Sequence, residues 1–335
     1  MNAAGGACTA AAGTNIALVK YWGKRDPELN LPATGSLSLT LAEMGTRTTV
    51  RFGGSSDGAG GDRVRLSGAP ADERFAFRVS RFLDLVRQQA AISAPAEVIT
   101  ENSVPTASGL ASSASGFAAL ALAASRAAGL TLAPQALSVL ARQGSGSAAR
   151  SIFGGFVEMA RGQKPDGSDC FAHPLESAAA WELRLVIAVT AAGAKALGST
   201  AAMDRTARTS PFFPAWVAGS DGDLADARAA IAERDLERLG RVAERSALRM
   251  HATAIAADPA IVYWNSATLA AMHAVYDLRA AGVAAYFTID AGPHVKVLCA
   301  AADAARVTHA LGATVGVLRT VIASPGPEAR VVEAS

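Results

Sequence analysis

Cysteine is scarce in this sequence, and the few cysteines are far apart. The 335 residues include three of them, Cys8, Cys170 and Cys299. An odd number at these separations provides neither a disulfide framework nor the close spacing of a zinc site. We therefore expect a reducing compartment and a cytoplasmic protein.

The chain also lacks a marked excess of charge and a convincing membrane span. It has 31 Lys and Arg against 29 Asp and Glu, a formal net charge of +2. No broad basic field points to nucleic acid or anionic lipid. The longest charge-free run, residues 102–125, is interrupted by Pro105, Gly109 and serines, which suits a loop and a helix better than a bilayer span. We expect neither a nucleic-acid partner nor a membrane partner.

Apolar residues are abundant, at 50% of the chain, while 18% are charged. This composition supports a sizeable core, and the length suggests two domains or one two-lobed enzyme. Residues 1–13, rich in alanine and glycine, are expected to be a disordered leader. Residues 14–184 are expected to form an N-terminal lobe and residues 185–335 a C-terminal lobe. Because strands and helices alternate irregularly, we expect an α+β fold rather than a doubly wound sheet.

Hydrophobic periodicity indicates where strands and helices form. Strands are predicted at residues 15–20, 36–41, 46–52, 63–66, 96–100, 154–159, 183–190, 284–290 and 294–300. Helices are predicted at residues 75–89, 115–128, 134–142, 221–250 and 266–282.

A glycine- and serine-rich segment, Pro-Thr-Ala-Ser-Gly-Leu-Ala-Ser-Ser-Ala-Ser-Gly at residues 105–116, runs straight into a predicted helix. Ser108, Ser112 and Ser113 place hydroxyls where the free N–H groups of a helix N-terminus bind anions, most often phosphate. The segment is not a Walker loop, since the Gly-Lys-Ser/Thr ending is absent. A small-residue helix cap packed on another helix fits the composition equally well.

Two further segments carry cations. Lys20, Tyr21 and Lys24 follow a predicted strand and suit an anionic substrate, although a solvated charge cluster is the commoner explanation. Arg150 lies in Gly-Ser-Gly-Ser-Ala-Ala-Arg-Ser-Ile-Phe-Gly-Gly and suits bidentate binding of a carboxylate or phosphate.

Asp290, in Thr-Ile-Asp-Ala-Gly-Pro, ends an apolar strand at a tight turn, a common position for a catalytic carboxylate. Arg150 and Asp290 are also compatible with purely structural turns.

Taken together, and in their order along the chain, the four segments resemble the diphosphomevalonate decarboxylases of the GHMP kinase superfamily. The resemblance spans roughly residues 14–300 and includes Ser199-Thr200-x-x-Met203 and His251-Ala-Thr253. It implies an N-terminal lobe like ribosomal protein S5 and a C-terminal ferredoxin-like lobe, with the active site between them. It also suggests a homodimer.

The resemblance implies the chemistry as well. The family uses ATP and Mg²⁺ to phosphorylate the tertiary 3-hydroxyl of mevalonate 5-diphosphate. Loss of that phosphate and of CO2 then gives isopentenyl diphosphate. Phosphorylation turns a poor leaving group into a good one, and departure of CO2 quenches the carbocation character that develops at C3.

Roles carry over by matching positions. Asp290 matches the aspartate at the 3-hydroxyl, Arg150 the arginine that fixes the C1 carboxylate, and Lys20 the lysine near the transferred phosphoryl. The segments that hold the substrate contribute Tyr21, Trp22, Gly23, Lys24, Ser145, Gly146, Ser147, Ala148, Ala149, Arg150 and Thr200. The ATP site contributes Asn102, Ser108, Gly109, Leu110, Ala111, Ser112 and Ser113, with Ser113 nearest the Mg²⁺.

Some positions depart from the family pattern. His294 stands in place of an asparagine, and Ala149 in place of a cysteine. Asn102-Ser103-Val104 replaces Asn-Asn-Phe ahead of the phosphate loop. The family's phosphate-binding arginine has no clear equivalent after Gly53, where Arg63 or Arg65 are the candidates. The choice between a 5-diphosphate and a 5-monophosphate therefore stays open.

Three other functions are compatible with these residues. One is a phosphomevalonate decarboxylase that yields isopentenyl phosphate, and another is a kinase that phosphorylates the 3-hydroxyl and stops. The third is a nucleotide-binding regulator without turnover, which the joint presence of Lys20, Arg150 and Asp290 argues against.

Overall fold

The computed structural model describes residues 6–53, 61–103, 112–175, 181–193 and 197–334. Its helices are α1 (Glu73–Ala90), α2 (Ser112–Ala127), α3 (Pro134–Gly144), α4 (Ser199–Thr209), α5 (Phe213–Glu233), α6 (Leu236–Ile255), α7 (Ser266–Ala280) and α8 (Ala304–Gly312), with short 3-10 helices η2 (Gly146–Ile152) and η4 (Ala301–Asp303). Its strands are β1 (Ala7–Val19), β2 (Lys24–Asp26), β3 (Leu31–Pro32), β4 (Ser36–Phe52), β5 (Arg63–Leu66), β6 (Ala69–Pro70), β7 (Ala96–Asn102), β8 (Phe156–Met159), β9 (Ala172–Pro174), β10 (Leu183–Val189), β11 (Ala285–Ile289), β12 (Val295–Ala300), β13 (Arg319–Ala323) and β14 (Arg330–Ala334). The expected α+β class is confirmed.

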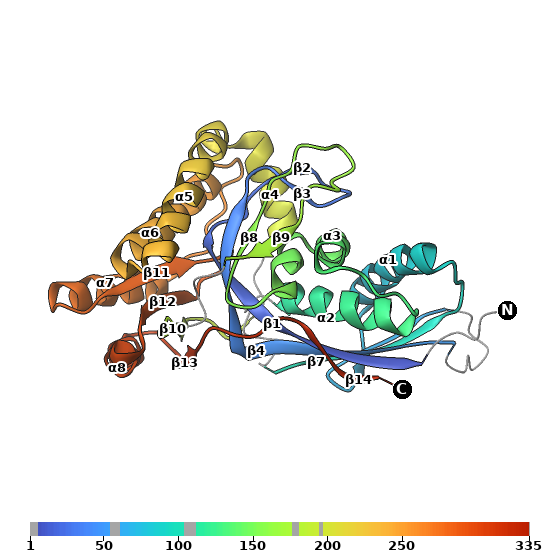
Figure 1. The fold of residues 1–335 in the computed structure, drawn as a ribbon. Helices are drawn as coiled ribbons and strands as arrows, with labels where there is room; N and C mark the ends of the chain where they lie inside the picture. Colours follow the sequence, from blue (N-terminus) through green and yellow to red (C-terminus); the bar gives the residue numbers. More distant parts are fainter. Residues whose placement is uncertain (1–5, 54–60, 104–111, 176–180, 194–196, 335) are drawn as a thin grey trace.

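The larger sheet is built around the long strand β4. The strand order is β14-β1-β4-β7-β5-β6, and β8 and β9 extend it from the first half of β4. Helices α1, α2 and α3 cover one face of this sheet, as Figure 1 shows. The core beneath them is rich in alanine because α2 lies close against β1 and β4.

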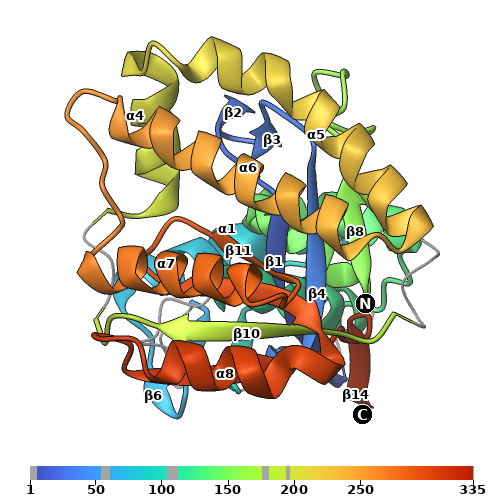
Figure 2. The same ribbon diagram turned by 90° about the vertical axis from the view of Figure 1, so that its left-hand side faces the viewer.

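The smaller sheet is antiparallel, in the order β11-β12-β10-β13, and β10, one of its two inner strands, is buried on both faces. Leu185 and Ile187 belong to a core shared with α5 and α6, whereas Val186 and Ala188 belong to a core shared with α7 and α8. Successive side chains of a strand point to opposite faces, which explains the division. Helices α7 and α8 lie in front of this sheet in Figure 2.

Residues 7–13, expected to be part of a disordered leader, form the beginning of a strand instead. Strand β1 begins at Ala7 and pairs with β4 on one side and with β14 on the other. Alanine and glycine have low intrinsic strand preference, but pairing on both edges overrides it here. At the pair Gly13–Gly45, a Cβ on Gly45 would lie 2.5 Å from the carbonyl oxygen of Ala12.

Three other expected elements, two strands and a helix, are also corrected. Residues 36–41 and 46–52 form one continuous strand, β4, rather than two. The long helix expected at residues 221–250 is two helices, α5 and α6. Arg234 has a left-handed backbone with φ of 53° and ends α5, and the carboxylate of Asp235 caps α6. Helices α4 and α8, of 11 and 9 residues, are short and were not among the predicted helices.

Two segments lie in a different sheet from the one that the expected lobe boundaries imply. Position 184, expected to end the first lobe, lies inside β10 of the smaller sheet. The last strand, β14, leaves the second lobe and pairs with β1 of the larger sheet, as Figure 1 shows. Residues 330–334 therefore belong to the larger sheet, in the first lobe.

No helix among the described residues is both long enough and apolar enough to cross a membrane.

Candidate active site

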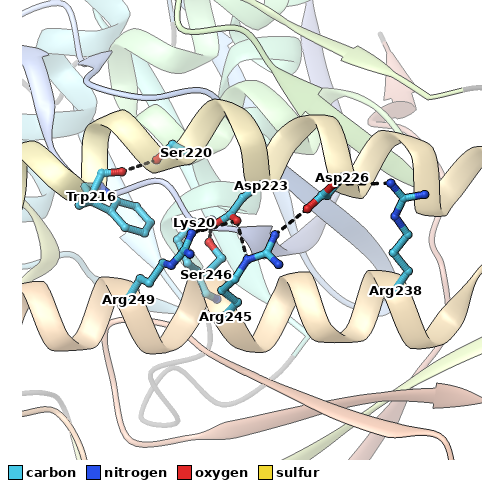
Figure 3. Close-up of polar contacts among 9 residues, drawn as sticks. All are labelled: Lys20, Trp216, Ser220, Asp223, Asp226, Arg238, Arg245, Ser246 and Arg249. Atoms are coloured by element: carbon cyan, nitrogen blue, oxygen red, sulfur yellow. Dashed lines mark hydrogen bonds and ion pairs between the residues drawn. The ribbon is translucent and has the colours of Figure 1, made fainter.

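Lys20 and Asp290 meet at the junction of the two lobes. Lys20 follows the last residue of β1, and Asp290 follows β11 at the turn to β12. The Lys20 Nζ donates hydrogen bonds to Asp290 Oδ1 at 2.6 Å and to the carbonyl oxygen of Ala17 at 2.8 Å. Helix α6 supports the pair, because the Lys20 backbone N–H donates to the Ser246 hydroxyl at 3.0 Å (Figure 3).

A second lysine reaches the same carboxylate. The Nζ of Lys296, in β12, lies 3.0 Å from Asp290 Oδ2, and its side chain is 4% exposed. Burial raises the pKa of Asp290, but the two ammonium groups outweigh it and hold the pKa well below its usual range. Burial lowers the pKa of Lys20 to about 8, although Asp290 acts in the opposite direction. Asp290 is therefore a carboxylate at neutral pH.

Arg150 is buried in η2 and held by neutral groups. Its guanidinium donates to the hydroxyls of Ser38 at 2.9 Å and Ser36 at 2.5 Å, and to Asn15 Oδ1 at 3.2 Å. Burial lowers the pKa of Arg150 to about 10, so it remains charged at neutral pH. Among the described residues it forms no ion pair with a carboxylate. Its positive charge is thus available to an anionic ligand.

These groups share a cavity of about 540 Å³ between the lobes. Its cationic lining residues are Lys20, Lys24, Arg74, Arg78 and Arg150, and Asp290 is its one acidic lining residue among those described. The N-terminus of α4 opens onto it through Ser199 and Thr200. Such a cavity suits a ligand that carries a carboxylate and phosphates.

Most of the predicted substrate residues line this cavity: Tyr21, Trp22, Lys24, Ser145, Gly146, Ser147, Arg150 and Thr200. A side chain at Gly146 would collide with the Tyr21 phenol, so the backbone itself forms the wall there. Three predicted residues do not line it. Ala148 and Ala149 point into the core beneath the larger sheet, and Gly23, with φ of 96°, packs on Phe213.

A smaller cavity of about 220 Å³ lies between α1, α2 and strands β4 and β7. Asn102 and Ser113, both predicted for the ATP site, line it, and Ser113 and Arg78 line both cavities. A nucleotide in the smaller cavity would therefore extend its phosphates toward the larger one. The other predicted ATP residues, Ser108, Gly109, Leu110 and Ala111, lie outside the described residues, and only the backbone of Ser112 is described.

Reasoning from the sequence missed three cations. Arg63 and Arg65 do not line the cavity; Arg63 reaches Glu97 and Arg65 donates to the carbonyl of Gly68. Arg74 and Arg78 of α1 line it instead. Their spacing of four residues puts them on one helix face, a signal that the apolar stripe of the same helix obscured. The third, Lys296, is the one charge within a buried apolar strand.

His294 and His251 are both buried near the site. The His294 Nδ1 accepts a hydrogen bond from the Thr190 backbone N–H at 3.2 Å, so this side chain anchors the turn after Asp290. His251 packs against Trp264 with ring centroids 4.8 Å apart and the rings tilted by 45°. Burial, followed by the Lys20 charge, lowers the pKa of His251 to about 3 and keeps it neutral.

Within the part of the chain that the structure describes, no three His, Cys, Asp or Glu side chains gather as a metal site. The hydroxyl of Ser113, exposed at the first turn of α2, is an oxygen donor of the kind that Mg²⁺ binds.

The chain resembles known proteins over most of its length. A family profile described as the diphosphomevalonate decarboxylase-like N-terminal domain matches residues 12–172, and one for the mevalonate 5-diphosphate decarboxylase C-terminal domain matches residues 185–324. The diphosphomevalonate decarboxylase of Gibberella zeae is 39% identical over 305 residues, 87% of this chain and 80% of that protein. The human enzyme is 35% identical over 87% of this chain and 76% of its own length.

Solved structures of mevalonate diphosphate decarboxylases are also similar to this chain. Mevalonate diphosphate decarboxylase from Staphylococcus aureus superimposes with a TM-score of 0.92 at 38% identity, covering 98% of each chain. A complex described as MDDEF with MVAPP, AMPPCP and magnesium gives a TM-score of 0.91 at 42% identity, covering 98% of this chain and 99% of that one. The fold and the site thus define a two-lobed enzyme of the GHMP kinase fold. More closely, the chain belongs to the diphosphomevalonate decarboxylase family.

Proposed function

We propose that this enzyme catalyses the ATP-dependent decarboxylation of mevalonate 5-diphosphate. The products are isopentenyl diphosphate, CO2, ADP and phosphate. The observation that carries this proposal is the Lys20–Asp290 pair, which shares one cavity with the buried Arg150. The cavity thus presents an acceptor for a hydroxyl, a cation for a moving phosphoryl group and a cation for a carboxylate.

Asp290 accepts the hydrogen bond of the substrate's 3-hydroxyl. Because two lysines keep it ionised, Asp290 orients the hydroxyl oxygen toward the γ-phosphate and takes up its proton as the new O–P bond forms. Lys20 lines the cavity beside it, so its ammonium stabilises negative charge on the phosphoryl group in transit.

Arg150 binds the C1 carboxylate of the substrate. A guanidinium already fixed by Ser36, Ser38 and Asn15 holds the C1–C2 bond in one orientation relative to C3. When the phosphorylated oxygen leaves C3, the C1–C2 electrons form the alkene and CO2 departs. The reaction needs no further base at this step.

The remaining cations bind phosphates. Lys24, Arg74 and the N-terminus of α4 suit the 5-diphosphate, and Arg78 and Ser113 stand between the two cavities, where the ATP phosphates would pass. The segment from Ser108 to Ser113 is proposed as the ATP phosphate loop. Mg²⁺ would be held by the nucleotide phosphates and Ser113, and there it neutralises phosphate charge.

The first experiment measures ADP and CO2 release by the purified protein with Mg²⁺-ATP. Mevalonate, its 5-phosphate and its 5-diphosphate are compared in parallel, with EDTA and Asp290→Asn as controls. Equimolar ADP and CO2 with the 5-diphosphate alone, lost in both controls, supports the proposal. Preference for the 5-phosphate makes the enzyme a phosphomevalonate decarboxylase, and ADP without CO2 makes it a 3-kinase. Absence of ADP with all three substrates overturns the substrate assignment.

We also propose that the enzyme is a homodimer in a reducing, cytoplasmic compartment. The buried free thiols of Cys8, Cys170 and Cys299 support the compartment. Light scattering after size exclusion tests the oligomeric state, and a mass of one chain would contradict the dimer.

A further inference from the structure

Lys296 occupies a position where its strand otherwise carries apolar side chains. Along β12, Val295, Val297 and Cys299 pack in the core under α7 and α8, and Leu298 packs in the core shared with the larger sheet. By alternation, Lys296 faces the same way as Leu298. Its ammonium is buried there, 3.0 Å from Asp290 Oδ2.

The carboxylate of Asp290 therefore has an ammonium on each oxygen. Lys20 takes Oδ1 at 2.6 Å and Lys296 takes Oδ2 at 3.0 Å. One lysine already neutralises the carboxylate. Burial of a second ammonium costs desolvation free energy that neutralisation of Asp290 does not require. The chain has only five lysines, so the concentration of two of them on one carboxylate is notable: Lys20, Lys24, Lys164, Lys195 and Lys296.

The two lysines differ in access to the cavity. Lys20 lines it, whereas Lys296 does not and lies behind Asp290 in the sheet. A ligand can thus draw the Lys20 ammonium away from Asp290, while Lys296 stays where it is. Without Lys296, such a movement would leave a half-buried carboxylate with no cation beside it.

We propose that Lys296 is a positioning residue that serves as the permanent counter-ion of Asp290 and releases Lys20 to follow the transferred phosphoryl group. This inference rests on the proposed function and adds a residue to its machinery. The charged and titratable groups around Asp290 are Lys20 of the β1 end, Lys296 of β12, Arg150 of η2 and the neutral His251 of α6.

The test replaces Lys296 by methionine, which has similar length and no charge. In Lys296→Met we expect kcat to fall about 10- to 100-fold, with KM for both substrates within about threefold of the wild type. Because burial then acts on Asp290 with one cation fewer, its pKa rises, and the acidic limb of the pH profile of kcat moves to higher pH. Lys164→Met replaces an exposed lysine that does not line the cavity; it is the matched control and should leave kcat and its pH profile unchanged.

A second readout needs no substrate. In protein labelled with ¹⁵N-lysine, NMR follows the titration of Lys20, whose pKa Lys296 lowers. The Lys20 titration should move to higher pH in Lys296→Met. If that variant fails to fold, Lys296→Gln removes the charge and keeps a hydrogen-bond donor on a side chain one atom shorter.

The outcomes separate the two proposals. A wild-type protein without turnover on any mevalonate derivative overturns the proposed function, whereas the Lys20 titration still tests the coupling. Wild-type kcat, pH profile and Lys20 titration in the folded Lys296 variants overturn the role of Lys296.

Discussion

At the scale of one residue, the buried charge of Arg150 is held by neutral groups and is therefore available to an anionic ligand. Replacing it by lysine keeps the charge but cannot reproduce three hydrogen bonds to Ser36, Ser38 and Asn15. We expect Arg150→Lys to raise KM for the phosphorylated mevalonate about 10- to 100-fold, because the two-point hold on the carboxylate is lost. Steady-state kinetics test this prediction. KM for ATP should stay within a few-fold, and an equal rise in both constants would contradict the assigned role.

The buried ammonium of Lys20 predicts a pH dependence. Its pKa is lowered to about 8, chiefly by burial, so the charged form is lost as the pH rises above that value. We expect kcat/KM, which reports the free enzyme, to fall above pH about 8, approaching tenfold per unit. A pH profile at constant ionic strength tests it. A kcat/KM that stays level to pH 9.5 would show that the Lys20 charge is not required.

At this scale, reasoning from the sequence identified three of the residues that line the cavity but not the groups around them. Lys20, Arg150 and Asp290 lie in recognisable segments, and the structure brings all three to one cavity. Lys296 and Arg78 lie in a strand and a helix whose apolar patterns drew attention to the core. Their position near Asp290 and the cavity depends on which face of the element meets the other lobe, and local spacing does not contain that information.

Among the elements, helices α5 and α6 are joined by a network of ion pairs, shown in Figure 3. The carboxylate of Asp223, 3% exposed, pairs with Arg245 at 2.8 Å and with Arg249 at 3.2 Å. Between these two arginines in the sequence lies Ser246, whose hydroxyl holds the backbone of Lys20. The network therefore fixes the helix that supports Lys20.

We expect Asp223→Ala to lower the free energy of unfolding by about 1–3 kcal/mol. The loss stays below that of a fully buried pair because Arg245 and Arg249 are partly exposed and can be solvated. Chemical denaturation measures the change. Arg241→Ala is the control, since it breaks an exposed pair with Glu237 and should cost less than about 0.5 kcal/mol. Equal effects of the two variants would show that the network contributes no more than a surface pair.

The same two helices show where prediction of elements from sequence ends. The charged, helical pattern over residues 221–250 identifies helix correctly but not the break in it. Arg234 adopts a left-handed backbone that glycine usually provides, so no composition signal marks the end of α5. The short helix α4 and strand β14 likewise form because the folded molecule offers them partners.

Over the whole molecule, the two lobes share one core. Leu37 and Leu39 of β4 pack in the same cluster as Leu185 of β10 and Leu224 of α5. The hydrogen bond from the Thr288 hydroxyl to the carbonyl of Ala17 adds a polar link between the sheets. Neither lobe can unfold alone without exposing this core.

We therefore expect a single cooperative unfolding transition rather than one for each lobe. Differential scanning calorimetry tests this, with the calorimetric enthalpy compared to the van't Hoff enthalpy. Two separated transitions would contradict it and would show that the shared cluster is weaker than the lobe interiors. Aggregation is controlled by rescanning and by varying the heating rate.

Many features of this protein can be predicted from local patterns in its sequence. Apolar periodicity is a local property, so it predicted most strands and helices and the α+β class, and local motifs identified the segments proposed to carry the chemistry. Long-range contacts needed the folded chain, because Lys20 and Asp290 are 270 positions apart and meet only where the lobes join. The same holds for the pairing of β14 with β1, for the arginines that face the cavity and for the second lysine on Asp290. Each depends on which faces of distant elements come together, and that is set by packing of the whole core.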